Sequence, residues 1–457
     1  MKFLSYLVIS LALFWSNTGF GQDIQKRTLR NGLDVVVIPS SVVPVATIEI
    51  TVKNGAFTEP PEFNGLSHLY EHMFFKGNAL IPNQEAYLKR IRELGIVFNG
   101  TTSTERVNYF FTLPSDKVLD GLEFMRAAIT SPRFDEAEFQ KEKQVVLGEV
   151  DRNESNPYYW LSRAINEKLW YAHPTRKDPL GDRQSIIDAT TAQMRQMKDT
   201  YYVPNNAVLM ITGDVQAEQA FKMAEDVFSS WTRGRDPFAR NPVPAHPPLK
   251  KSEAVLVVKD VQMPSVSFNW HGPSVDADPK ATFAADVLSY IIAQPSSQFQ
   301  KNLVDSGITL NSYLSYYTQR YTGPISLSAQ VQPDKLEDAI QFLLRETEKF
   351  SSPEYYTDEQ LESAKTLLVI DDLYGREQMS SFTHTVSFWW ATAGLDYYLN
   401  YLDGLRSVTR DDINRYVAMY IRNRPWVLGV IASQAVVDAK QVNETKLLNL
   451  GESAISK

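Results

Sequence analysis

The stretch His68-Leu69-Tyr70-Glu71-His72 places two histidines four residues apart, with a glutamate between them. The chain has 457 residues and only six histidines, so two in one five-residue window is a concentration that packing does not require. In a helix, positions i and i+4 lie on the same face. Both imidazoles can therefore bind one metal ion, and neutral imidazole nitrogen is a common ligand of zinc.

The glutamate between the two histidines adds a base to this predicted metal site. A catalytic zinc takes three protein ligands and one water, and it lowers the pKa of that water to about 7. Glu71 lies beside the water and can take its proton as the water attacks a carbonyl. The local sequence predicts a helix from Gly65 to Phe75, with Asn64 as its N-cap and Gly77 ending it. The alternative is a surface helix whose apolar residues face a core and whose histidines bind nothing.

A third ligand is expected on a second helix, predicted from about Asp135 to Arg152. This segment contains Glu142 and Glu149, which are two turns apart on one face and can point toward the same site. One glutamate would bind the metal, and the other could accept the free ring N–H of a ligand histidine. Two glutamates on a helix are usually solvated, so this interpretation depends on the histidine pair.

The motif and its spacing resemble one known family. With 76 residues between His72 and Glu149, the chain resembles the pitrilysin/insulinase family of inverted-motif zinc peptidases, in the branch of mitochondrial processing peptidase and its bacterial homologues. The resemblance implies that one Zn²⁺ ion is bound by His68, His72 and Glu149. It also implies that Glu71 is the general base and that Glu142 orients a ligand histidine. The implied fold is α+β: two similar αβ domains, each an antiparallel-rich sheet covered by helices, facing each other as a clamshell around a chamber.

A second segment of the sequence agrees with this resemblance. Asn99, Gly100, Thr101 and Thr102 precede a strand-like run at 107–111 that is rich in β-branched and aromatic residues. The stretch resembles the family's edge strand beside the zinc, which in relatives receives the peptide by strand addition. The resemblance therefore implies that these four residues bind substrate. An ordinary sheet strand preceded by a polar turn is the alternative.

The length and composition indicate more than one domain. With 457 residues, 43% of them hydrophobic, the chain can build two large cores. Five prolines between residues 233 and 250 indicate an extended, semi-rigid linker. A predicted helix, turn and buried strand at 192–211 are repeated at 411–431, which indicates a duplicated domain. The expected divisions are a zinc-bearing domain at 22–235, a linker at 236–250 and a similar domain without the metal motif at 251–450.

The N-terminal residues predict export. Met1-Lys2 is followed by an apolar stretch and then by small residues, which is typical of a secretory signal peptide at 1–21. An uncleaved membrane anchor is the competing interpretation. No later segment has 18 uninterrupted apolar residues, so we expect no stable membrane span after cleavage. The chain has no cysteine and hence no disulfide, and we expect a periplasmic or secreted protein.

The second half differs from the pattern of active relatives. In those proteins the second domain supplies an arginine and a tyrosine that bind substrate near the scissile bond. Here Leu303 and Leu310 stand where that pair would be, whereas Arg320 and Tyr321 lie at another spacing. Bacterial members often divide the work between two chains. The resemblance thus implies that this chain is the zinc-bearing subunit of a heterodimer whose partner supplies the arginine and tyrosine.

These patterns predict a zinc metalloendopeptidase that hydrolyses short or unfolded peptides in a closing chamber. The net charge of −8 and the lack of a basic block argue against a nucleic-acid partner. The alternative is a non-catalytic scaffold or assembly subunit of the same fold, as some family members have become. A different zinc hydrolase on the same ligands is less favoured, because the resemblance extends over most of the chain.

Overall fold

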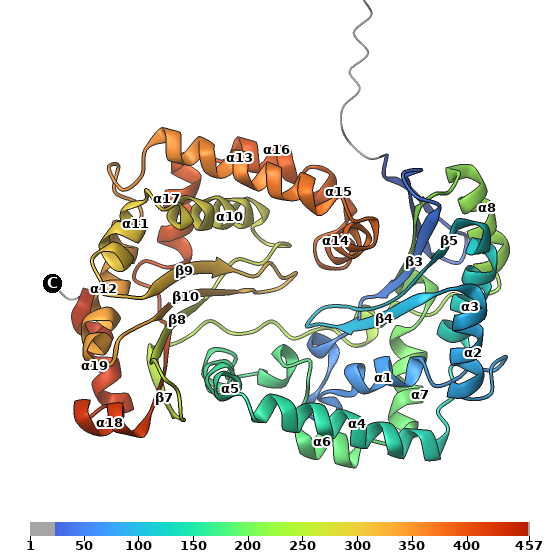
Figure 1. The fold of residues 1–457 in the computed structure, drawn as a ribbon, viewed down its shortest axis with the longest axis horizontal. Coiled ribbons are helices and arrows are strands. Elements are labelled where there is room, and N and C mark those ends of the chain that lie inside the picture. The colour runs from blue at the N-terminus through green and yellow to red at the C-terminus, as the bar shows by residue number, and fades with distance from the viewer. Residues whose placement is uncertain (1–22, 456–457) are drawn as a thin grey trace, which may run out of the picture.

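The computed structural model describes residues 23–455, which form two αβ units joined by the proline-rich segment (Figure 1). The predicted signal peptide lies outside the described residues. Within residues 23–455, no helix combines the length and the apolar character needed to cross a bilayer. The predicted α+β class with two similar units is confirmed by the element order and the two sheets.

The first sheet has six strands and lies in the N-terminal unit. Its central strands are buried on both faces, because helices cover both sides. All neighbours are antiparallel except the parallel pair β2 and β6. In spatial order the strands are β1 (Gln25–Thr28), β2 (Asp34–Pro39), β6 (Ala207–Gly213), β3 (Val45–Val52), β5 (Val107–Pro114) and β4 (Val97–Thr102).

The second sheet repeats this arrangement with five strands. Again one pair, β7 and β11, is parallel and the others are antiparallel. Its edge strand β9 occupies the place that β4 has in the first sheet, next to a hairpin partner. In spatial order the strands are β7 (Glu253–Val258), β11 (Val427–Ala432), β8 (Ser265–His271), β10 (Pro324–Gln330) and β9 (Asn311–Tyr316).

Helices of the N-terminal unit alternate with its strands along the chain. Most of them cover one face of the first sheet and form a core with its inward side chains. Their bounds are α1 (Leu66–Phe74), α2 (Gln84–Leu94), α3 (Val118–Thr130), α4 (Glu136–Glu154), α5 (Pro157–Leu169), α6 (Arg183–Asp188), α7 (Thr191–Tyr201) and α8 (Ala217–Phe228).

Helices of the C-terminal unit cover the second sheet in the same way. A short π-helical turn at Lys301–Asp305 follows α11. The bounds are α10 (Pro279–Ala293), α11 (Gln298–Gln300), α12 (Leu336–Lys349), α13 (Asp358–Gly375), α14 (Met379–Thr392), α15 (Leu395–Leu399), α16 (Tyr401–Ser407), α17 (Arg410–Tyr420), α18 (Gln434–Lys440) and α19 (Glu444–Ile455).

The two units exchange one helix each across their boundary. Helix α14 of the second unit lies on the far face of the first sheet, where Val386 and Trp390 contact Val208 and Met210 in one buried cluster. Helix α5 of the first unit lies on the second sheet, where Leu161, Ile165 and Leu169 join Val255, Val427 and Ile431. The two units therefore share apolar core and do not depend on the linker alone for their arrangement.

The repeated unit predicted from the sequence is confirmed. Helix α7, a turn at Pro204–Asn206 and strand β6 correspond to α17, a turn and β11 in the second unit. The linker differs from an all-extended segment because it contains α9 (Pro237–Arg240). Proline is compatible with that helix because it stands at the first position, where no backbone N–H is needed.

Candidate metal centre

Helix α1, which carries the HxxEH motif, begins differently from the prediction. Asn64 is not its N-cap; that place is taken by Gly65, whose φ of 86° is the left-handed region that favours glycine. The free N–H groups of Gly65 and Ser67 instead donate to the buried Glu59 carboxylate, at 2.8 and 2.6 Å. The Asn64 side chain donates to the carbonyls of Thr175 and Asp178. The preceding turn with Glu59 and the distant segment with Thr175 and Asp178 therefore fix the start of this helix.

The structure brings the three predicted ligand side chains together. The Nε2 atoms of His68 and His72 are 3.2 Å apart. The Glu149 carboxylate lies 3.4 Å from the His68 Nε2 and 3.8 Å from the His72 Nε2. One donor atom from each residue lies within 4.8 Å of the others, and this is the one such group found among the described residues. Two imidazoles and one carboxylate are a donor set that zinc accepts.

The protonation of His68 also fits a metal ligand. Burial, together with the charge of His72, lowers the pKa of His68 to about 4, so its imidazole is neutral near neutral pH. Its Nδ1 atom is buried and has no hydrogen-bond partner among the described residues. A neutral ring whose Nε2 faces a second imidazole and a carboxylate is the form that coordinates a metal.

Glu142 lies where the resemblance implied, against the other side of His72. Its carboxylate is 2.9 Å from the His72 Nδ1 and accepts a 2.6 Å bond from the Lys76 ammonium. Burial would raise the pKa of Glu142, but these two partners outweigh it and lower the pKa below its usual value. Because the ionised Glu142 accepts the Nδ1–H, the Nε2 of the neutral His72 ring is left to act as a donor atom. The sequence argument missed Lys76, although it follows His72 by one helical turn.

The side chain of Glu71 lies against strand β4. The Thr102 hydroxyl donates to its Oε2 at 2.6 Å. Burial raises the pKa of Glu71, and the bond from Thr102 opposes this rise only in part. A Cβ on Gly100 would lie 2.7 Å from the Glu71 Cγ and 2.8 Å from its Oε1. Glycine at this position therefore allows the strand backbone to approach the carboxylate.

Strand β4 is the edge of the first sheet, as the resemblance implied, but its four named residues do not share one face. Successive side chains of a strand alternate between the two sides. Gly100 and Thr102 face Glu71. Asn99 and Thr101 therefore face the other side of the sheet, where Phe110, the register partner of Asn99, contacts the ring of His384.

The structure shows the surroundings of the residues that the sequence comparison considered for the substrate-binding arginine and tyrosine. Leu303 is fully buried in the second core, and Leu310 is exposed. The Arg320 backbone N–H donates to the buried Glu105 carboxylate at 2.8 Å, so this segment holds the loop between β9 and β10 against the first unit. Sequence reasoning missed Glu105, because its partner lies 215 residues away.

The chain is similar to known proteins in sequence. Residues 35–182 match the family described as insulinase (peptidase family M16), and residues 188–368 match the peptidase M16 inactive domain. The zinc protease PqqE of Helicobacter pylori is 25% identical over 76% of this chain and 79% of its own length. The mitochondrial-processing peptidase subunit beta of Lentinula edodes is 22% identical over 93% of both chains.

A solved structure shares the fold. The first half of the periplasmic protease PqqL from Escherichia coli superposes with a TM-score of 0.78 at 17% identity, covering 95% of this chain and 98% of that one. The two adjoining sequence matches together extend from residue 35 to residue 368, through both units, and the HxxEH helix lies inside the first of them. This chain belongs to the insulinase family of peptidases, family M16.

Proposed function

We propose that this chain is a zinc-dependent endopeptidase that binds one Zn²⁺ ion through His68, His72 and Glu149. The observation that carries the proposal is the convergence of two imidazole nitrogens and one carboxylate from helices α1 and α4 within 4.8 Å. The neutral state of His68 and the hydrogen bond from His72 to Glu142 support it. A zinc ion bound there would polarise the peptide carbonyl and lower the pKa of its water.

The chain's own residues would then carry the proton and hold the substrate. Glu71 accepts a proton from the attacking water and donates it to the leaving amine. Thr102 binds one carboxylate oxygen of Glu71 and leaves the other free for this transfer. An extended peptide adds to the free edge of β4, where backbone hydrogen bonds at Asn99–Thr102 hold it. This mode suits short or unfolded peptides inside a closing chamber.

The test is hydrolysis of a quenched fluorescent peptide by the full chain and by Glu71→Gln. Loss of the base is expected to lower kcat by about 10²- to 10⁴-fold. Zinc measured by elemental analysis is expected to stay at one ion per chain in both proteins, because Glu71 is not among the three converging donors. Unchanged hydrolysis in Glu71→Gln would remove the assigned base. A zinc-free, inactive wild type would favour a scaffold or assembly subunit.

We also propose that a partner chain completes the centre. Leu303 and Leu310 provide no charge or hydroxyl, and the Arg320 segment is engaged with Glu105. A relative of this chain is named as one subunit of a peptidase. Copurification and reconstitution test this proposal: a second family chain that carries the arginine and tyrosine is expected to raise kcat. Full activity of the isolated chain, unaffected by the added partner, would contradict it.

We also propose that the chain is exported and that it is divided into a zinc-bearing domain, a linker and a second domain at residues 22–235, 236–250 and 251–450. The described strands and helices of each unit fall inside these ranges, apart from the last helix, which ends at Ile455. N-terminal sequencing of the protein recovered from a periplasmic fraction checks the export signal. A mature N-terminus near Gln22 is expected.

A further inference from the structure

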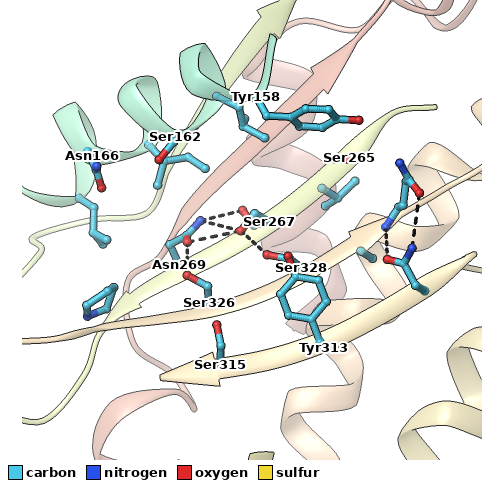
Figure 2. A pocket seen from close by; sticks show the side chains of 18 residues that line it. Tyr158, Ser162, Asn166, Ser265, Ser267, Asn269, Tyr313, Ser315, Ser326 and Ser328 are labelled. Atoms are coloured by element: carbon cyan, nitrogen blue, oxygen red, sulfur yellow. Dashed lines mark hydrogen bonds between the residues drawn. The ribbon is translucent and has the colours of Figure 1, made fainter. Parts of the chain in front are cut away.

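A cavity of about 580 Å³ lies between helix α5 and the second sheet, apart from the metal centre (Figure 2). Its walls are α5 from the first unit and strands β8, β9 and β10 from the second. None of the 18 lining residues is Asp, Glu, Lys, Arg or His, although 22% of the whole chain is charged. Most of them carry a hydroxyl or an amide. The cavity is thus polar and uncharged.

Helix α5 presents an apolar face and a polar face, and residues of both line this cavity. Leu161, Ile165 and Leu169 recur every four residues and pack on the second sheet. Tyr158, Ser162 and Asn166 recur at the same spacing, one face further round, and line the cavity, as Figure 2 shows. The apolar face fixes the helix on the sheet, so the polar face is held at a constant position above the strands.

The floor of the cavity is a connected network of neutral side chains. Ser267 and Ser328 are hydrogen-bonded at 2.8 Å across β8 and β10, and the Ser326 hydroxyl donates to the Asn269 Oδ1 at 2.7 Å. The Asn269 amide donates in turn to the Val427 carbonyl at 3.2 Å. This network keeps the floor rigid and needs no charge to be satisfied.

Two side chains of the walls face the cavity with unused hydrogen-bonding capacity. Ser162 on α5 and Ser315 on β9 are exposed, and their hydroxyls make no hydrogen bond within residues 23–455. Tyr313, on the same face of β9 as Ser315, is 56% exposed and offers an apolar ring beside these hydroxyls. An arriving ligand therefore meets free donors, free acceptors and an aromatic surface.

This chemistry discriminates by charge. A charged side chain that enters the cavity loses hydration and finds no opposite charge among the lining residues, which costs free energy. A serine, asparagine or glutamine side chain, or a bare backbone, can instead exchange its water for the wall hydroxyls and amides. The cavity consequently favours an uncharged, polar stretch of chain.

The helix that forms one wall of the cavity follows closely, in the sequence, the helix that carries a residue of the metal centre. Helix α4, which carries Glu149, ends at Glu154, and α5 begins three residues later at Pro157. The opposite wall includes β9, the edge of its sheet, beside which an extended chain can lie. Resting on the peptidase function proposed above, we propose that this cavity is a specificity subsite that holds an uncharged polar stretch of the peptide substrate, away from the bond that is cut.

The first test compares peptides with one common cleaved core. Each carries, at one end or the other, a segment of four residues that is Ser/Asn-rich, all Asp or all Lys, and the core alone is the reference. When the segment is attached at one of the two ends, the Ser/Asn peptide is expected to have a KM roughly 10-fold below those of both charged peptides. The kcat values are expected to be similar. Equal KM values for all peptides, with cleavage intact, would overturn the proposal. No cleavage of the core alone would instead contradict the peptidase function.

Charge added to the cavity gives the second test. In Ser315→Lys and in Ser162→Lys, the KM of the Asp peptide is expected to fall and that of the Lys peptide to rise, each by about 5-fold or more. The two serines come from opposite walls, so a folding defect in one variant leaves the other informative. Ser230→Lys adds the same charge at an exposed serine of the first unit, outside the cavity, and is expected to change neither KM. Unaltered peptide preference in both cavity variants would refute the subsite.

Discussion

The helix pair α1 and α4 in the first unit and the pair α10 and α13 in the second occupy the same places in the order of elements, yet they differ in chemistry. In the first pair, imidazole and carboxylate donor atoms lie within 4.8 Å of one another. In the second pair, Tyr290 of α10 donates to Asp371 of α13 at 2.5 Å, and Asp286 of α10 accepts a 2.7 Å bond from Tyr401 of the neighbouring helix α16. The fold brings polar side chains together at this place in both units. Only side chains whose ligand atoms are not taken up by hydrogen bonds to each other can bind a metal.

Removing one donor from each pair gives the largest expected difference. Glu149→Ala is expected to lower the zinc content well below one ion per chain and peptide hydrolysis by roughly 10³-fold or more, because two imidazoles alone bind zinc weakly. Asp371→Asn, on the corresponding helix α13, is expected to leave the zinc content unchanged. Elemental analysis and the peptide assay measure both. Zinc retained by Glu149→Ala, or lost from Asp371→Asn, would contradict the assignment.

The two exchanged helices differ as well. Helix α5 leaves a cavity over the second sheet, whereas α14 seals the first sheet over Glu49, a fully buried carboxylate. Glu49 accepts hydrogen bonds from His384, Ser387 and Thr51. Burial would raise its pKa, but the bond from His384 and the nearby Arg106 hold the pKa below its usual value. The boundary between the units therefore contains a buried, ionised group that depends on its partners.

His384→Ala is expected to lower the free energy of unfolding by about 3–5 kcal/mol, because Glu49 stays buried without its main partner. Chemical denaturation at neutral pH measures the change. His173→Ala, at a half-buried histidine without a side-chain hydrogen bond among the described residues, is the control and should cost under about 1 kcal/mol. His384→Asn retains a donor near the Nδ1 position and should recover part of the loss. Equal effects at both histidines would show that Glu49 does not need His384.

Asp286 on α10 predicts a pH dependence of stability in the second helix pair. Burial raises the pKa of Asp286 to about 7, and the hydrogen bond from Tyr401 opposes this only in part. Between about pH 4 and pH 7 the folded chain keeps a proton that the unfolded chain has released, so this group's stabilisation is present below about pH 4 and is lost as the pH rises to about 7. The full shift corresponds to up to about 4 kcal/mol.

Asp286→Asn is expected to flatten that decline, as measured by denaturant unfolding at a series of pH values. Tyr401→Phe removes the opposing hydrogen bond and should move the decline to higher pH. A slope between pH 4 and pH 7 that is the same in wild type and Asp286→Asn would mean that Asp286 is ionised in the folded chain throughout.

The sequence predicted the parts of the centre that depend on local periodicity. His68 and His72 share a face of α1, and Glu142 and Glu149 share a face of α4, because spacings of four and seven are properties of any helix. The duplicated helix, turn and strand were also predicted correctly. The N-cap was predicted wrongly, because the carboxylate of Glu59, six residues before Gly65, accepts the free N–H groups at the helix start.

Contacts set by register and tertiary packing could not be predicted in this way. The bond between Thr102 and Glu71 depends on how β4 lies against α1, 31 residues away in sequence. The exchange of α5 and α14 between the units depends on which sheet face each helix meets, and both sheets offer apolar faces. An amphipathic pattern shows that a helix packs on something; it does not identify the surface.

The smallest expected effect concerns the contact between β4 and Glu71. The second unit has no HxxEH motif and hence no counterpart of this glutamate. Gly100→Ala would place a Cβ 2.7 Å from the Glu71 Cγ, but the crowded atoms belong to a side chain that can turn aside. The fold should therefore be kept, with Tm changed by about 2 °C or less. Glu71 should lose its position, and with it the bond to Thr102, so kcat is expected to fall roughly 10- to 100-fold at unchanged zinc content.

The matched control is Gly375→Ala on α13, where a Cβ would meet nothing within 4 Å. It should leave kcat unchanged and, since alanine favours helix over glycine, should not lower Tm. If Gly100→Ala retained the wild-type kcat, Glu71 could act from more than one position, and the close approach of β4 would serve the strand's backbone and not the base. If it lost zinc, the contact would instead support the ligand helix α1.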